Sequence, residues 1–186
     1  SIAEILHPAV REGLKLLGFD DSRGLEIHHQ GDLPARSGMG SSSSFSVGLL
    51  NVLTALQGGS CDRHALALKA MELEQDVLKE NVGSQDQAAA AYGGFNRIAF
   101  GTDGAIRVDP VRIAPARRAE LEAHLLLVFT GASRFGSDVA AAMRGTMAAK
   151  APELRRMRAM VDEALTVLEG SGPLAAFGEL LHRSWT

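Results

Sequence analysis

The segment Pro34–Ser44 reads PARSGMGSSSS and combines the features of a phosphate-binding loop. Its two glycines, Gly38 and Gly40, allow the main chain to approach a ligand closely. The serines are followed by apolar residues that predict a buried helix, whose unpaired first-turn N–H groups and positive dipole end favour an anion. A polyphosphate fits this order better than a serine-rich linker does, because an apolar helix begins at once.

Three common motifs fail on this segment. A Walker loop needs Gly-Lys-Ser/Thr, and no lysine follows either glycine. A dinucleotide fingerprint needs a third glycine where Ser43 stands, and an acyl-transfer elbow needs a second glycine where Ser44 stands. The loop is therefore predicted to bind phosphate in some other way.

Glu74 is the second candidate for chemistry. On a helix through residues 64–80, seven apolar residues share one face, with Glu74 near its middle. These are Leu66, Ala67, Ala70, Met71, Leu73, Val77 and Leu78. A buried carboxylate needs a partner, either an arginine in a structural ion pair or a hard cation such as Mg²⁺. The helical pattern leaves both open, and the upstream loop favours Mg²⁺.

Asp86 is the third candidate, in the segment 81–94. Ser84 can cap a short helix, and Asp86 then needs no role beyond that of a first-turn carboxylate favoured by the helix dipole. The alternative rests on Gln85–Gln87 and the four alanines behind them, which predict a closely packed helix whose tip lines a cleft. An aspartate at that tip can orient a substrate hydroxyl and accept its proton during phosphoryl transfer.

Composition and charge exclude several classes of function. The 186 residues are 46% hydrophobic and 22% charged, which is typical of a globular protein. A net charge of −3 without a long basic block argues against nucleic acid or an anionic membrane as the main partner. The only cysteine is Cys61, which indicates a reducing cytoplasm, and the scattered histidines argue against a transition-metal site. No apolar stretch reaches membrane-spanning length.

Hydrophobic spacing predicts an α+β protein. Helices are expected at 2–17 with an interruption at Pro8, 42–56, 62–80, 84–92, 135–149, 153–169 and 174–186. Strands are expected at 25–30 and 125–129, and a hairpin pairs 95–100 with 105–109. A fold boundary is expected near 110–120, where mixed elements give way mostly to helices. The apolar faces of the last three helices leave a homo-oligomer open.

The loop at 34–44, Glu74 and the Gly83-x-x-Asp86 segment ending in Gly93-Gly94 resemble the GHMP small-molecule kinases in order and spacing, with Met39 replacing the usual leucine. The sequence from Leu73 to Asn96 is most similar to the D-glycero-D-manno-heptose 7-phosphate kinase branch. The resemblance implies an N-terminal part like ribosomal protein S5 domain 2 and a partial helical or ferredoxin-like C-terminal part. It also implies domains at 1–112, carrying the ATP phosphate loop, and at 113–186.

The resemblance also implies roles for particular residues. The ATP phosphates would be held by Gly38, Met39, Gly40, Ser41, Ser42 and Ser43. Mg²⁺ would be held by Glu74 and Ser42, or by Ser41 in place of Ser42. Asp86 would be the catalytic residue that faces the sugar anomeric hydroxyl. The sugar phosphate would contact Asp86 together with Gly83, Gln85, Thr130, Gly131 and Arg134, although Arg134 also fits a surface arginine.

The implied activity is ATP-dependent phosphorylation of D-glycero-D-manno-heptose 7-phosphate at its anomeric oxygen by a cytoplasmic enzyme. Members of the family also carry an N-terminal substrate-binding strand and loop and a second glycine-rich motif near the C-terminus. Neither is found in residues 1–186, so we expect an excerpt of a larger protein with little or no activity alone. Two alternatives stay open: another GHMP substrate such as galactose, fucose or mevalonate, or a non-catalytic nucleotide-binding or interaction fragment.

Overall fold

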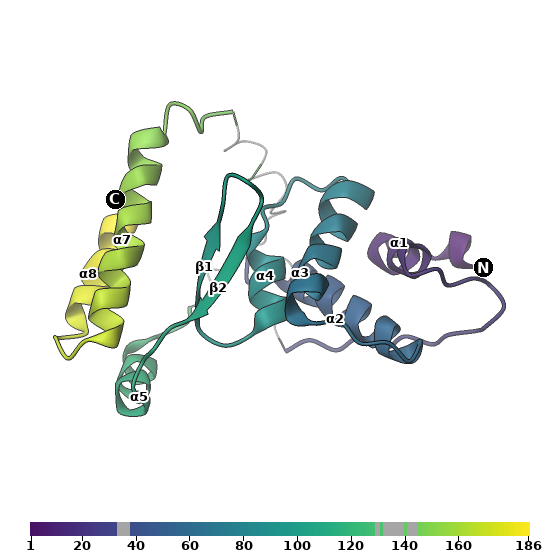
Figure 1. Cartoon of the computed structure of the whole chain (residues 1–186), viewed down its shortest axis with the longest axis horizontal. Coiled ribbons are helices and arrows are strands. Elements are labelled where there is room, and N and C mark those ends of the chain that lie inside the picture. The colour runs from purple at the N-terminus through teal and green to yellow at the C-terminus, as the bar shows by residue number, and fades with distance from the viewer. Residues whose placement is uncertain (33–37, 129–130, 132–139, 141–144) are drawn as a thin grey trace. The chain divides into compact units, whose positions relative to one another are not determined.

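A computed structural model of the chain describes residues 1–32, 38–128, 131, 140 and 145–186 (Figure 1). Its contacts divide the chain into two compact units, Ser1–Gly94 with Gly131–Ala142, and Phe95–Thr130 with Met143–Thr186. The break in contacts between Gly94 and Phe95 differs from the domain limit implied at 112/113. That limit refers to the domains of a family and stays a prediction.

The first unit is helical. Its elements are η1 (Ile2–Glu4), α1 (Pro8–Leu16), α2 (Ser41–Leu56), α3 (Arg63–Met71), the π-helical segment η2 (Glu72–Val77) and α4 (Gln85–Tyr92). The interruption expected at Pro8 is confirmed, since proline at the first helical position of α1 has no N–H to leave unpaired. α2, α3 and α4 pack against one another, and α1 packs against α2 and η2 (Figure 1).

Two apolar clusters hold this unit together. One joins α2 to α3 and η2 through Val47, Leu50, Leu66, Ala70 and Leu73. The other joins α1 to α2 through Leu14, Leu49 and Leu53. Leu50 and Leu73 are fully buried, and each such side chain stabilises the fold by about 1.5–3 kcal/mol relative to an exposed one. This packing sets the start of α2 beside η2 and α4.

The second unit begins with the predicted hairpin. Strands β1 (Asn96–Phe100) and β2 (Ile106–Pro110) are antiparallel, with Asn96 opposite Pro110 and Phe100 opposite Ile106. The turn between them closes through a hydrogen bond from the N–H of Gly101 to the carbonyl of Ala105 at 2.7 Å. The helices of this unit are α5 (Pro115–His124), α7 (Ala151–Glu169) and α8 (Ala175–Trp185), and α7 packs along α8.

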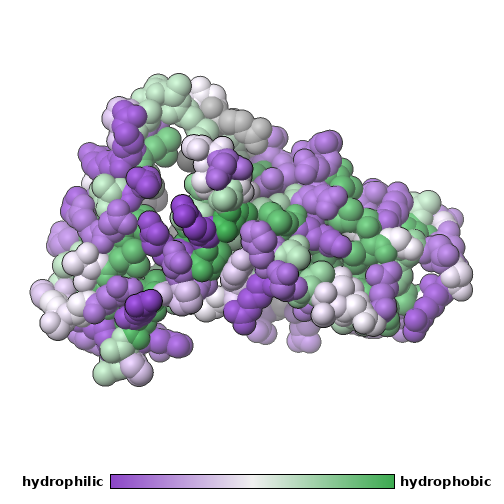
Figure 2. Space-filling view, viewed as in Figure 1, coloured by the Kyte–Doolittle hydropathy of each residue, from purple (hydrophilic) through white to green (hydrophobic). Residues whose placement is uncertain are grey.

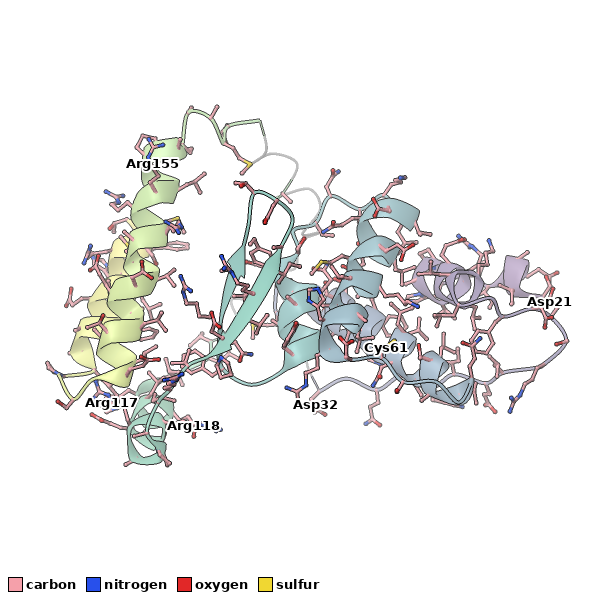
Figure 3. All side chains as sticks on the ribbon, viewed as in Figure 1. Asp21, Asp32, Cys61, Arg117, Arg118 and Arg155 are labelled. Carbon is pink, nitrogen blue, oxygen red and sulfur yellow. The ribbon has the colours of Figure 1, made fainter. Side chains whose placement is uncertain are left out.

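An arginine and an apolar cluster connect α5 to the turn between α7 and α8. Leu121, Leu168 and Leu174 are buried together. Arg117, labelled on α5 in Figure 3, donates from Nη2 to the carbonyl oxygens of Val167 at 3.0 Å and Gly172 at 2.6 Å. Because Nη2 donates to these two carbonyl oxygens and Nη1 pairs with Glu120, Arg117 has a structural role.

Two predicted strands are wrong. Residues 25–30 form no strand, and residues 125–128 form none either and are exposed, while Phe129 lies outside the described residues. An alternating or apolar run becomes a strand only where another strand satisfies its N–H and C=O groups. In the described part of the chain the only sheet is β1–β2. Leu125–Val128 are thus exposed apolar side chains. Figure 2 shows apolar surface as green areas among the purple.

The helices agree better with expectation. α2, α4, α7 and α8 confirm predicted helices within about two residues. The helix predicted at 135–149 lies largely outside the described residues, and 145–150 form turns. α5 was not predicted, although Pro115 at its first position is a helix-start signal. None of the helices in the described ranges has the length and apolar content needed to cross a bilayer.

Candidate active site

The predicted phosphate loop enters α2 through two glycines in the left-handed region. Gly38 has φ 77° and Gly40, the N-cap residue of α2, has φ 68°. The first helical bond runs from the N–H of Ser44 to the carbonyl of Gly40 at 2.9 Å, and no described side chain caps the helix. Because N–H groups before Ser44 have no acceptor within the helix, this end of α2 can bind an anion.

Glu74 is buried, with 1% of its surface exposed, as its place on the apolar face predicted. Its Oε2 accepts a hydrogen bond from the Ser43 hydroxyl at 2.9 Å and another from the Gln87 side-chain amide. Its Oε1 is buried and has no hydrogen-bond partner among the described residues. In that part of the chain no arginine pairs with Glu74, so the structural ion pair left open by the sequence is not found there.

Glu74 lies in η2, where the α-helical ladder of α3 changes to a π-helical one. The N–H of Leu78 bonds to the carbonyl of Leu73, five residues back, and the N–H of Glu80 bonds to that of Glu74, both at 2.9 Å. Lys79 then takes a left-handed conformation with φ 57°, which is uncommon for a residue other than glycine. π-helical turns recur at functional sites, and this one contains the buried carboxylate.

The negative charge of Glu74 also affects a second carboxylate, Glu80. The pKa of Glu80 is raised above its ordinary value, first by partial burial and then by the negative charge of Glu74. No described basic side chain offsets that charge at Glu74 Oε1. The surroundings of Glu74 are therefore electronegative and suited to a cation.

Asp86 lies in the first turn of α4, and its carboxyl group is next to the predicted phosphate loop. A Cβ built on Gly40 would lie 3.3 Å from both Cγ and Oδ2 of Asp86, although 46 positions separate the two residues in sequence. Asp86 itself is exposed. The packing of α4 on α2 therefore brings together the loop and the aspartate that the sequence singled out.

The predicted cap of α4 is wrong in its detail. Ser84 occupies the N-cap position, but its side chain makes no capping hydrogen bond. Its hydroxyl instead accepts from the Gln75 amide at 3.1 Å, and the same amide donates to the carbonyl of Gly83 at 3.2 Å. Gln75 is half-buried and holds the loop that leads to Asp86.

Glu74 and Asp86 contact the same helix start within one turn. Glu74 contacts it through Ser43, and Asp86 lies against Gly40, three residues earlier. Three residues span about 4.5 Å along an α-helix. A phosphate held by the first N–H groups of α2 would thus lie near a buried carboxylate and near an exposed one.

The remaining site predictions differ in how they are placed. Ser42, the predicted magnesium ligand, is exposed, whereas Ser43 is the serine that contacts Glu74. Met39, Gly83 and Gln85 are exposed, and Ser41 is half-buried. Gly131 is exposed with φ 77°, and Thr130 and Arg134 lie outside the described residues.

Sequence reasoning missed Gln87 as a site residue. It is fully buried and hydrogen-bonded to Glu74. An amide next to a row of alanines, on the face that packs against α2 and α3, was the available signal.

The described residues contain no group of three or more His, Cys, Asp or Glu side chains suited to a metal. Mg²⁺ does not need one, because it is usually held by one or two carboxylates together with phosphate oxygens and water. The buried Oε1 of Glu74, which has no described partner, fits that requirement. A phosphate-bound magnesium ion thus suits these residues better than an all-protein metal centre.

Residues 4–94 match the family described as GHMP kinases N terminal domain, so this part of the chain is a GHMP kinase N-terminal domain. A D-glycero-alpha-D-manno-heptose 7-phosphate kinase of Campylobacter jejuni is 30% identical over 161 residues, covering 86% of this chain and 47% of that protein. The bifunctional fucokinase/GDP-fucose pyrophosphorylase of Arabidopsis thaliana is 32% identical over 129 residues, 68% of this chain and 12% of that protein. A galactokinase of Pyrococcus furiosus is 33% identical over 96 residues, 52% of this chain and 26% of that protein.

The fold also matches a solved structure. A crystal structure of a D-glycero-D-manno-heptose 1-phosphate kinase from Bacteroides thetaiotaomicron superimposes with a TM-score of 0.71 and 22% identity, over 96% of this chain and 54% of that one. This confirms the α+β, GHMP-kinase-like fold. The chain spans about half the length of the two heptose kinases, 47% and 54%.

Proposed function

We propose that this protein is an ATP-dependent sugar kinase that phosphorylates a heptose 7-phosphate at its anomeric hydroxyl. One observation supports this most strongly: the Asp86 carboxyl group lies against Gly40 at the anion-binding start of α2. A carboxylate in that position can receive a hydroxyl directed at a bound phosphate. The GHMP kinase N-terminal domain at residues 4–94 supports the same assignment.

In the proposed reaction the start of α2 holds the ATP phosphates. Gly38 and Gly40 let the main chain approach them, and the N–H groups of the first turn donate to their oxygens. Ser41, Ser42 and Ser43 complete the proposed nucleotide contacts. Because these N–H groups are fixed by α2 before the reaction starts, little reorganisation is needed as negative charge shifts during transfer.

Asp86 orients the anomeric hydroxyl and accepts its proton. The sugar oxygen forms a bond to the γ-phosphorus while the bond from that phosphorus to the β–γ bridging oxygen breaks, and ADP leaves. Positioning of this kind is the main contribution that a protein makes to phosphoryl transfer. We propose Gly83, Gln85, Thr130, Gly131 and Arg134 as further contacts to the sugar phosphate.

Glu74 would hold Mg²⁺ through Oε1, with Ser42 as the proposed second protein ligand. When bound, the ion neutralises charge on the phosphate oxygens. The Ser43 hydroxyl, already committed to Glu74 Oε2, would keep the carboxylate pointing in one direction. The two carboxylates then have separate roles, Glu74 toward the metal and Asp86 toward the sugar.

The choice of a heptose phosphate follows the extent of similarity. The Campylobacter heptose 7-phosphate kinase matches 86% of the chain, against 68% for the fucokinase and 52% for the galactokinase. Galactose, fucose and mevalonate therefore remain the competing substrates. We also propose a cytoplasmic location, where ATP is available, and little activity for residues 1–186 alone, since the chain spans about half of the heptose kinases.

A substrate panel tests the proposal. The full-length protein is incubated with ATP, Mg²⁺ and, in turn, heptose 7-phosphate, fucose, galactose and mevalonate, and ADP release and phosphorus NMR of the product are recorded. We expect the highest kcat/KM with heptose 7-phosphate and a phosphate on its anomeric carbon. A tenfold preference for another compound of the panel would overturn the assignment of heptose 7-phosphate as the substrate. ATP binding without turnover of any of them would support a non-catalytic nucleotide-binding protein.

A further inference from the structure

We propose that Gln87 is a positioning residue that orients Glu74 so that one carboxylate oxygen is left free for the divalent cation. This inference rests on the proposed function, since it requires a metal-bound nucleotide. Gln87 is fully buried, and its amide nitrogen donates to Oε2 of Glu74. It is the residue directly after Asp86 in α4.

The two oxygens of Glu74 are in different situations. Oε2 accepts from both Ser43 and Gln87, whereas Oε1 is buried without a described partner. Hydrogen bonds to an ionised acceptor are about twice as strong as neutral ones, so the two donors fix the rotation of the carboxylate. Oε1, to which neither residue donates, is the oxygen that a cation can bind.

A neutral amide suits this task. A lysine or arginine at this position would itself neutralise Glu74 and compete with a metal, and a carboxylate would repel it. The amide donates one hydrogen bond and adds no charge. Side chains that orient a metal ligand in this way contribute strongly to metal affinity, and their loss typically lowers it about 10–100-fold.

Gln87 also connects the two halves of the proposed site. Asp86 and Gln87 are consecutive, so their side chains leave α4 about 100° apart. The Asp86 carboxyl group is beside Gly40, and the Gln87 amide reaches Glu74 in η2. The hydrogen bond from Gln87 thus fixes the distance between the carboxylate assigned to the sugar and the one assigned to the metal.

The test uses full-length protein and the variant Gln87→Met, which keeps a similar volume and removes the donor. The matched control is Gln57→Met, since the Gln57 amide donates to the carbonyl of Leu17, away from Glu74. Binding of Mn²⁺ is titrated by electron paramagnetic resonance in the presence of a non-hydrolysable ATP analogue. Affinity for the analogue without metal and the melting temperature are recorded alongside.

We expect Gln87→Met to weaken Mn²⁺ binding about 10–100-fold, with metal-free analogue binding unchanged, and Gln57→Met to leave both unchanged. Wild-type Mn²⁺ affinity in a folded Gln87→Met protein would overturn the inference. If Gln87→Met does not fold, Gln87→Asn keeps an amide that is too short to reach Glu74, and the same weakening is expected from it.

The readout separates this inference from the proposed function. Mn²⁺ binding needs no sugar, so a protein that phosphorylates none of the panel sugars can still show the expected loss, and then only the proposed reaction fails. A protein that turns over heptose 7-phosphate while Gln87→Met binds Mn²⁺ normally would keep the reaction and remove the role of Gln87.

Discussion

The carboxyl group of Asp86 lies so close to Gly40 that a Cβ on Gly40 would come within 3.3 Å of its Cγ and Oδ2. This places an exposed acid from α4 at the start of α2. The same contact gives Gly40 two reasons to be glycine: its φ of 68° and the space that Asp86 occupies.

Gly40→Ala is expected to lower both stability and activity. The left-handed conformation alone costs a residue other than glycine about 1–3 kcal/mol, and the added methyl also displaces Asp86. Gly58→Ala is the matched control, because Gly58 has φ 76° and nothing within 4 Å of an added Cβ. Melting temperatures and kcat/KM are compared. We expect similar destabilisation in both variants and a kcat/KM loss specific to Gly40→Ala; equal kcat/KM for the two would count against a role for the Gly40–Asp86 contact.

Glu74→Gln separates a metal ligand from a structural acid. Burial of a carboxylate with one unpartnered oxygen is costly, so its neutral isostere is expected to raise the melting temperature of the metal-free protein. The same variant should lower kcat/KM at least about 100-fold, more than the loss expected for a residue that only orients the ligand. Glu72→Gln, an exposed position in η2, serves as control. Lower stability together with intact activity would show that Glu74 is structural.

The Ser43 hydroxyl donates a hydrogen bond of 2.9 Å to Glu74 Oε2, and Ser43→Ala removes it. A hydrogen bond to a charged group contributes about 1.5–3 kcal/mol, so we expect a comparable loss in the free energy of unfolding by urea. The magnesium concentration for half-maximal turnover should rise as well. Ser46→Ala, at a buried serine one turn further along α2, is the control. A Mg²⁺ requirement unchanged in Ser43→Ala would argue that this serine only packs.

Glu80 makes the free energy of unfolding depend on pH, and the raised pKa of Glu80 determines the sign of that dependence. The folded protein holds the Glu80 proton more tightly than the unfolded chain does, so stability falls as pH rises from the ordinary glutamate pKa through the raised one. Glu80→Gln should therefore increase the free energy of unfolding near pH 7 in metal-free protein, and the gain should disappear below about pH 4. Urea unfolding at several pH values measures this. A gain of equal size at acid pH would show that the charge of Glu80 is not the cause.

Glu74 shows how far helical spacing carries a prediction. The spacing placed it on the apolar face, and burial follows from that face alone. The hydrogen-bond partner of Glu74 could not be predicted in this way. The register of η2 is π-helical, and spacing at 3.6 residues per turn assumes an α-helix. Which serine contacts Glu74 also depends on where α2 begins. With Ser41 as the first helical residue, Ser43 faces the core and Ser42 does not.

Long-range relationships could not be predicted from local pattern. The contact of Gly40 with Asp86 and the hydrogen bond of Gln87 to Glu74 depend on how α4 packs on α2 and η2. The run Leu125–Val128 is apolar, as a buried strand would be, but the described residues offer it no strand to pair with. Local sequence thus predicts which face a residue occupies, and packing decides what it meets there.

The most direct measurement compares full-length wild type with Asp86→Asn, using Asp76→Asn at an exposed position of η2 as control. Turnover of heptose 7-phosphate is measured by ADP release, and ATP binding by calorimetry. We predict a kcat about 10²–10⁴-fold lower in Asp86→Asn with nearly unchanged affinity for ATP, and normal values for Asp76→Asn. A kcat for Asp86→Asn within a few-fold of wild type would contradict the assignment of Asp86 as the residue that receives the sugar hydroxyl.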